Sequence, residues 1–87
     1  MFTVVMPKRV EKQVQKLRQL EKKKLVQLIE DLRDFGPVQN RWRNYSKLGD
    51  LKHHCHLSYR WIACWRETEK ELVLEVYYVG SRENAPY

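Results

Sequence analysis

Residues 72–82 read LVLEVYYVGSR, and this stretch decides the fold of the chain. Its first eight residues are leucine, valine and tyrosine with a single glutamate, and apart from the glutamate these side chains suit a half-buried strand. We therefore predict a strand over residues 72–79. A polar turn, TEK at residues 68–70, precedes it, and the segment before that turn, WIACWR at residues 61–66, is again rich in strand formers. Two such segments joined by a short turn predict an antiparallel pair.

A third strand is predicted just upstream of this pair. Residues 54–57, HCHL, alternate along the chain as the residues of a half-buried strand do. The segment before them, residues 38–52, lacks a regular apolar period and is rich in Asn, Ser, Gly and Asp, so we expect a basic loop there. The C-terminal half therefore predicts a three-stranded antiparallel meander.

The N-terminal half predicts one strand followed by helix. Residues 2–5, FTVV, form a short β-rich run. Pro7 then suits the first turn of a helix, where a missing N–H group carries no penalty. A narrow apolar stripe at helical spacing continues over residues 8–20.

A second apolar stripe at helical spacing spans residues 25–35, and Gly36-Pro37 ends it. The two stripes can belong to one bent helix or to a hairpin that turns in the lysine-rich stretch around Glu21. We favour the hairpin because it buries both stripes on a small sheet.

Residues 1–87 therefore predict a single α+β domain: an N-terminal strand, a two-helix hairpin and an antiparallel meander, with the helices packed on one face of a small sheet. The other face of the sheet is left for function. Hydrophobic residues make up 43% of the chain and charged residues 32%, a balance that excludes a disordered chain. No apolar run approaches the roughly 20 residues that span a bilayer. Two cysteines do not make a secreted disulfide framework, so we expect a cytoplasmic protein without membrane contact.

The distribution of charge favours a polyanionic partner. The chain carries 17 Lys and Arg against 11 Asp and Glu, a net charge of +6. Residues 41–60 hold five of the cations, one anion and all three histidines, whereas residues 61–87 carry a net negative charge. A basic middle of this kind is typical of nucleic-acid binding, and an acidic protein partner is the alternative.

The histidines concentrate in the run HHCH at residues 53–56. On a strand, His54 and His56 share one face, while His53 and Cys55 share the other. Leu57 has the parity of Cys55, which predicts that the cysteine side faces the core. Two imidazoles side by side in a positive segment should have lowered pKa values, which would leave a neutral base available at pH 7.

Three interpretations of this pair compete. The histidines can be surface residues without a role. A metal site needs three or four converging ligands, and the usual ligand spacing is missing. Acid–base work on a phosphodiester is the third interpretation, because imidazole suits proton transfer near neutrality.

Residues predicted to come near the histidines favour the third interpretation. Arg60 starts one strand and Arg82 follows another, and a guanidinium can grip a phosphate through two parallel N–H bonds. Aromatic side chains nearby offer flat faces for a nucleobase, namely Tyr59, Trp61 and Tyr87. The tryptophan can equally belong to the core.

On these motifs the chain resembles the RelE/ParE superfamily of bacterial type II toxins. Residues 72–82 resemble the family's last strand and its Gly-x-Arg or Gly-x-His ending, and residues 84–87 resemble its aromatic-ended tail. SKLG at residues 46–49 resembles the lysine–leucine segment before the family's second strand. CHLSYRW at residues 55–61 is most similar to the YafQ branch. The resemblance covers nearly the whole chain.

The resemblance implies roles for single residues. His56 and Trp61 match the strand histidine and the following tryptophan of the YafQ branch, and His54 and His56 stand where the RelE branch has two lysines. Arg60 and Arg82 match two arginines of the RelE branch, in positions where the YafQ branch has an aspartate and a histidine. Tyr87 falls near the terminal aromatic residue of the RelE branch.

A relative of the RelE and YafQ kind would be the toxin of a toxin–antitoxin system and a ribosome-dependent mRNA endoribonuclease that blocks translation. The ribose 2′-hydroxyl would attack the adjacent phosphate without a metal or other cofactor. The catalytic residues would be His54, His56, Arg60, Arg82 and Tyr87. The substrate-binding residues would be Trp61, Tyr59, Lys47, Lys52, Arg41 and Arg43.

The resemblance also implies partners, namely the ribosome with its mRNA and a small acidic cognate antitoxin. The toxin would contact DNA only indirectly, through this antitoxin. The ParE branch has the same fold but inhibits DNA gyrase by protein binding, without ribonuclease activity. That function is the alternative, and the histidine pair distinguishes the two because a docking protein does not need it. A plain RNA-binding accessory domain is a third possibility.

Overall fold

The centre of the sheet is formed by β4 (Trp61–Glu67) and β5 (Val73–Ser81). The computed structural model describes residues 1–87 and pairs these two strands antiparallel, from Trp61 opposite Ser81 to Glu67 opposite Leu74. The predicted antiparallel pair of strands is confirmed. β5 continues two residues past its predicted end at Val79. The register shifts once, between Cys64 and Trp65.

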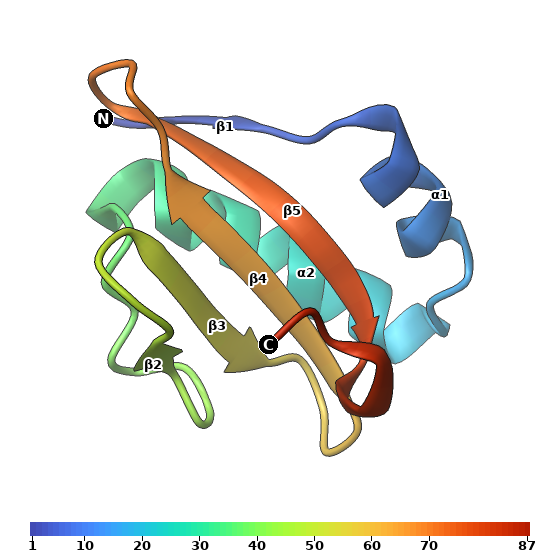
Figure 1. Ribbon diagram of the computed structural model, residues 1–87. Coiled ribbons are helices and arrows are strands. Elements are labelled where there is room, and N and C mark those ends of the chain that lie inside the picture. The colour runs from blue at the N-terminus through green and yellow to red at the C-terminus, as the bar shows by residue number, and fades with distance from the viewer.

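Three further strands complete a five-stranded sheet of order β1-β5-β4-β3-β2 (Figure 1). β3 (Lys52–His56) pairs antiparallel with β4 and completes the predicted meander. β1 (Thr3–Val5) lies on the other side of β5 and runs parallel to it. β2 (Ser46–Lys47) is a two-residue edge strand inside the segment predicted as loop.

The two helices are α1 (Lys8–Gln15) and α2 (Gln19–Phe35). The predicted first helix, residues 8–20, is therefore too long, and the turn lies upstream of the lysine-rich stretch. The backbone becomes extended at Arg18, with φ −73° and ψ 166°, and α2 starts at the next residue. Arg18 makes two hydrogen bonds to Glu21, at 3.1 and 2.9 Å, which hold this residue at the start of α2.

Gly36 ends α2 as predicted. Its φ of +88° lies in the region that favours glycine, and its N–H donates to the carbonyl of Leu32. A Cβ atom at this position would lie 2.8 Å from the ring of Phe2, so the close approach of this ring also favours glycine.

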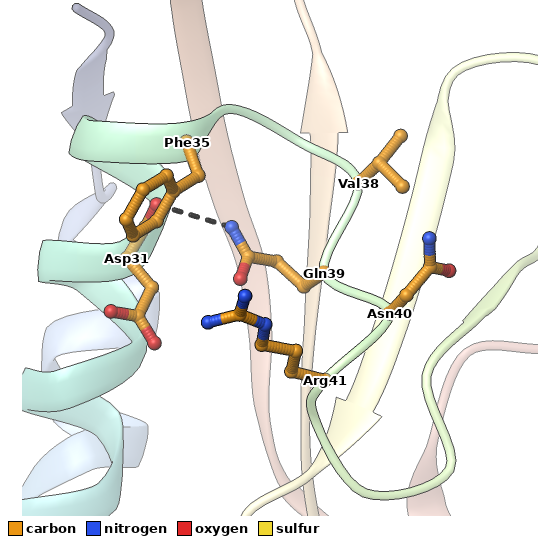
Figure 2. A pocket seen from close by; sticks show the side chains of 6 residues that line it. All are labelled: Asp31, Phe35, Val38, Gln39, Asn40 and Arg41. Atoms are coloured by element: carbon orange, nitrogen blue, oxygen red, sulfur yellow. Dashed lines mark hydrogen bonds between the residues drawn. The ribbon is translucent and has the colours of Figure 1, made fainter.

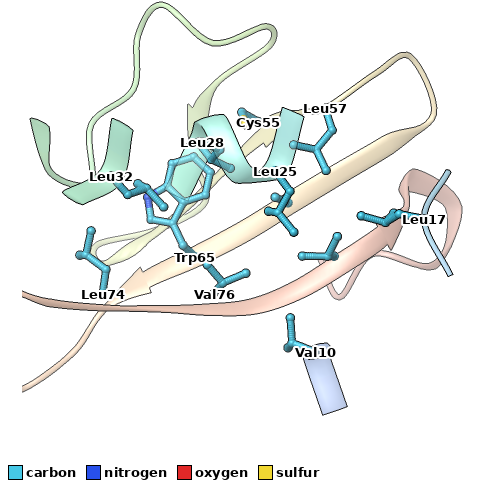
Figure 3. Packing of buried hydrophobic residues seen from close by; sticks show 12 residues of the cluster. Val10, Leu17, Leu25, Leu28, Leu32, Cys55, Leu57, Trp65, Leu74 and Val76 are labelled. Carbon is cyan, nitrogen blue, oxygen red and sulfur yellow. The ribbon is translucent and has the colours of Figure 1, made fainter. Parts of the chain in front are cut away.

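The core lies between α2 and one face of the sheet (Figure 3). Leu25, Leu28 and Leu32 of α2 point at Trp65 and its neighbours on the strands, and α1 adds Val10. Trp65 is fully buried, and its indole N–H donates to the carbonyl of Pro37 at 3.0 Å. The helices thus cover one face of the sheet, as predicted. Neither helix is long and apolar enough to cross a membrane.

A matched pair of substitutions on α2 tests this packing. Leu28 is fully buried, so Leu28→Ala should lower the free energy of unfolding by about 2–5 kcal/mol through lost burial and the cavity left behind. Val26 is 60% exposed on the same helix, and Val26→Ala should change the free energy of unfolding by no more than about 0.5 kcal/mol. Urea denaturation measures both, and equal losses would contradict the packing.

Candidate active site

The side chains of β3 alternate between the two faces of the sheet as predicted. Cys55 belongs to the core, and His53 is fully buried beside it, with its ring stacked 5.8 Å from that of Trp65. The ring nitrogens of His53 bond to the Tyr45 hydroxyl at 2.7 Å and to a Glu67 carboxylate oxygen at 2.9 Å. Because both nitrogens are occupied inside the fold, His53 is a structural residue.

His54 and His56 lie on the opposite side, which we call the helix-free face. Their ring centroids are 6.0 Å apart. In the sheet register they pair with Cys64 and Ile62 of β4, whose side chains share this face. The predicted pairing of the two imidazoles is confirmed.

Hydrogen bonds select the same tautomer for both rings. Nδ1 of His56 lies 3.2 Å from the carbonyl oxygen of Tyr59, which only accepts, so Nδ1 carries the proton. Nδ1 of His54 lies 3.1 Å from the Ser46 hydroxyl and 3.4 Å from the Ser46 carbonyl oxygen, and the same tautomer satisfies both contacts. In the neutral form of each ring, Nε2 is then the free acceptor, the form that a general base needs.

Both histidines are well shielded from solvent, with 8% of His54 and 6% of His56 exposed. Burial lowers the pKa of His54, and the neighbouring His56 lowers it further, against an opposing contribution from the Ser46 carbonyl. The predicted fall is confirmed for His54, although burial and not the positive surroundings is its main cause. The imidazole is therefore neutral at pH 7.

The C-terminal tail covers this pair. The ring of Tyr87 meets that of His54 edge-on, with centroids 4.9 Å apart. In Figure 1 the C-terminus lies in front of the sheet, on the side away from α2. Burial raises the pKa of Tyr87, so its phenol keeps its proton at neutral pH. The predicted proximity of Tyr87 to the histidines is thus observed.

The two predicted arginines meet at the end of the β4–β5 pair. The Arg82 backbone N–H donates to the Arg60 carbonyl at 2.8 Å, and the Arg82 guanidinium lies 5.8 Å from the centre of the Tyr59 ring. Neither arginine forms an ion pair, with Glu83 or any other acid. Together with Trp61 they line a cleft of about 290 Å³. Two exposed guanidiniums without anionic partners are suited to bind a phosphate.

The cleft and the histidines are joined through residues 57–60, the β3–β4 turn. Tyr59 lines the cleft with its side chain and holds Nδ1 of His56 with its carbonyl oxygen. Trp61, the predicted base platform, packs partly against the core cluster and presents only part of its ring to the cleft.

Arg41 and Arg43 line a second groove of about 540 Å³, together with His56 and Tyr59. Figure 2 shows its neighbour, a pocket of about 320 Å³ in which the Arg41 side chain points toward α2. The loop that carries these arginines is fixed: Gln39 donates to the Gly36 carbonyl at 2.8 Å, and the Trp42 indole N–H to Asp31 at 2.9 Å.

The two predicted lysines lie farther from the arginine cleft. Lys52 lies at the far end of β3, with its ammonium group 5.8 Å from the centre of the Tyr77 ring. Lys47 is exposed on β2 opposite His53. Ser46, which orients His54, was not predicted as a site residue, because only the pairing of β2 with β3 places it there. No three His, Cys, Asp or Glu side chains group as metal ligands.

The pKa of His54 predicts a contribution to stability that depends on pH. Because the folded pKa lies below the ordinary value of 6.5, the unfolded chain binds more protons, and stability falls as the pH drops below that value. The free energy of unfolding of His54→Gln should therefore fall less steeply between about pH 7 and pH 5 than that of the parent. Lys52→Gln, a substitution on the same strand that leaves His54 in place, is the control. A His54→Gln slope equal to that of the control would contradict the assignment.

No protein-family model and no curated sequence matches this chain. Its fold, in contrast, matches solved structures. A chain of the archaeal RelE–RelB complex from Pyrococcus horikoshii aligns with a TM-score of 0.79 at 22% identity, over 97% of this chain and 98% of that one. The isolated RelE toxin from Escherichia coli gives 0.76 at 15% identity over 99% and 89%, and an E. coli YafQ mutant gives 0.74 at 17% over 95% and 96%. The chain therefore has the fold of the RelE and YafQ toxins, as the resemblance predicted.

Proposed function

We propose that this protein is the toxin of a type II toxin–antitoxin system and cleaves ribosome-bound mRNA. The observation that carries the proposal is the arrangement on the helix-free face. Two imidazoles with free Nε2 atoms stand beside a protonated tyrosine. The turn that holds His56 also contributes to a cleft lined by two unpaired guanidiniums. The fold alone would not support an activity, because one fold serves many functions.

These groups suit cleavage through the ribose 2′-hydroxyl. Nε2 of His56, the imidazole held by the β3–β4 turn, takes the 2′-proton while the 2′-oxygen attacks the neighbouring phosphorus. The bond from phosphorus to the 5′-oxygen breaks, and the phenol of Tyr87 gives its proton to that oxygen. The products are a 2′,3′-cyclic phosphate and a 5′-hydroxyl. Every proton in this step comes from or goes to a group of the chain or substrate.

Arg60 and Arg82 bind the reacting phosphate and its developing negative charge. Tyr59 lines the cleft between them and also holds His56 through its carbonyl oxygen. A phosphate in this cleft would therefore lie beside the turn that orients the proposed base. Tyr59, 65% exposed, offers a stacking face for the flanking base, and the accessible part of Trp61 adds to it.

The shielding of His54 and His56 requires that substrate binding displaces the tail. With Tyr87 against His54, a nucleotide cannot approach both imidazoles from the helix-free face. Residues 83–87 donate only two backbone hydrogen bonds, from Ala85 to the Arg82 carbonyl and from Asn84 to the Ser81 hydroxyl, so little holds them down. Closure around RNA would bring Tyr87 back onto the substrate.

The cationic surface indicates the partners. Ribosomal RNA would lie along the groove that Arg41 and Arg43 line and over the exposed lysines Lys47 and Lys52. A small acidic antitoxin would neutralise the toxin by covering the same arginines, and the toxin would meet DNA only through it. These partners place the protein in the cytoplasm.

Single-turnover cleavage of a message on saturating ribosomes tests the site. His56→Gln should slow the chemical step by about 10²–10⁴-fold and leave ribosome affinity nearly unchanged, because one shielded imidazole adds little to binding a polyanion. Arg82→Ala should slow it by a similar order, since the phosphate loses a guanidinium.

Arg33→Ala is the matched control for charge. Arg33 is exposed near the end of α2, away from the cleft, and its loss should leave the chemical step intact. If His54→Gln and His56→Gln both cleave within about threefold of the parent, the histidines are not the base.

A further inference from the structure

A second cavity adjoins the arginine cleft, and the proposed reaction does not use it. It has a volume of about 350 Å³, lies between the end of α1 and the last residues of β5, and shares two wall residues with the cleft, Trp61 and Ser81. Figure 1 shows α1 beside β5. The base of a nucleotide is one sugar away from its phosphate. A base can therefore reach this cavity, which we call the α1–β5 pocket, while its phosphate lies between Arg60 and Arg82.

Gln13 of α1 lines this pocket with its amide in a defined orientation. β1 pairs with β5 only as far as Glu75, so the backbone of β5 beyond that residue has an edge without a partner strand. At this edge Oε1 of Gln13 accepts the Val79 N–H at 2.9 Å. Because the oxygen takes that bond, the amide NH₂ group is the part left over, and it makes no hydrogen bond within the chain.

Two further hydrogen-bond donors line the pocket. The indole N–H of Trp61 forms no hydrogen bond, unlike those of Trp42 and Trp65, and it is not buried away from solvent. The Lys16 ammonium forms no ion pair, and no acidic side chain lines the pocket. An amide NH₂, an indole N–H and an ammonium can donate but not accept. Asn84, which also lines the pocket, can do either and so does not discriminate.

A set of donors of this kind discriminates among the four bases. Guanine presents two acceptors, N7 and O6, on one edge, whereas adenine carries an amino donor beside its N7 and cytosine carries one at N4. In single-stranded RNA these edges are accessible, because the bases can be splayed out of the stack. The pocket therefore favours guanine, and the amino groups of adenine and cytosine would meet donors with which they cannot pair.

We propose that the α1–β5 pocket binds a guanine base next to the scissile phosphate, with Gln13, Lys16 and Trp61 as specificity-determining residues. Tyr59 offers its stacking face to the base on the other side of that phosphate. The inference rests on the proposed function for its effect on cleavage, while the binding of a free nucleotide concerns the pocket alone.

NMR of the free protein, titrated with the 3′- and 5′-monophosphates of the four nucleosides, tests the pocket. The Trp61 indole N–H signal should shift with guanosine monophosphate at about tenfold lower concentration than with adenosine monophosphate, a ratio typical of one good pair of base contacts. On ribosomes, kcat/KM for cleavage should be about tenfold higher with guanine than with adenine at one of the two positions that flank the cut.

Gln13→Glu is the diagnostic variant, because it keeps an oxygen for the Val79 N–H and turns the free donor into an acceptor. The preference for guanine over adenine should fall to about twofold or less in both assays. Gln15→Glu is the matched control: it adds the same charge at an exposed position of α1 outside the pocket and should keep the preference of the parent. The preference is a ratio within one variant, so a general loss of stability or affinity does not move it.

A Trp61 signal that no nucleotide moves, equal shifts with all four bases, or a Gln13→Glu preference equal to that of Gln15→Glu would each overturn the proposal. If Gln13→Glu does not fold, Lys16→Met decides by the same criteria, since it also removes a donor from the pocket. A parent chain that never cleaves ribosome-bound message refutes the proposed function instead, and the nucleotide titration then judges the pocket by itself.

Discussion

The pairing of β4 with β5 is the constraint on which the rest of the structure depends. On one face it presents Trp65 and Val76 to α2, and the core forms around them. At one end it brings together Arg60, which precedes β4, and Arg82, which follows β5, and a backbone hydrogen bond joins them. The single register shift after Cys64 adds one residue to β5, which bends a strand and increases its twist locally. Core and phosphate cleft are therefore products of the same ladder.

Burial of the imidazole pair determines both the charge of His54 and the accessibility of the two rings. In water an isolated histidine is partly charged near pH 6.5, but within this fold burial keeps His54 neutral. The same burial shields both imidazoles from solvent, and the tail that ends in Tyr87 lies against His54. If a polyanion binds this face as proposed, displacing this short, weakly held segment would cost little free energy.

Much of this architecture was predictable because it follows local rules. The parity of residues 53–57 correctly assigned His53 and Cys55 to the core and the other two histidines to the opposite face. The β4–β5 hairpin and the end of α2 at Gly36 followed from strand-forming residues and a glycine. The sheet order was less accessible, because β1 pairs parallel with a strand about 70 residues away.

The misses lie where tertiary contacts override local pattern. Nothing at Lys16 to Arg18 breaks a helix by propensity, yet the chain turns there, and Arg18 then pairs with Glu21 at the start of α2. β2 is only two residues long, too short for any period, so the role of Ser46 toward His54 was invisible.

The central claim is that the helix-free face performs ribonuclease chemistry, and the ends of the cleaved message test it most directly. The purified protein would be incubated with ribosomes programmed with a defined message, and the new termini would be mapped. The account predicts breaks within the ribosome-bound codon that carry a 2′,3′-cyclic phosphate and a 5′-hydroxyl, and their loss in His56→Gln. An intact message, together with inhibition of purified DNA gyrase by the same preparation, would contradict it and establish the gyrase-directed alternative.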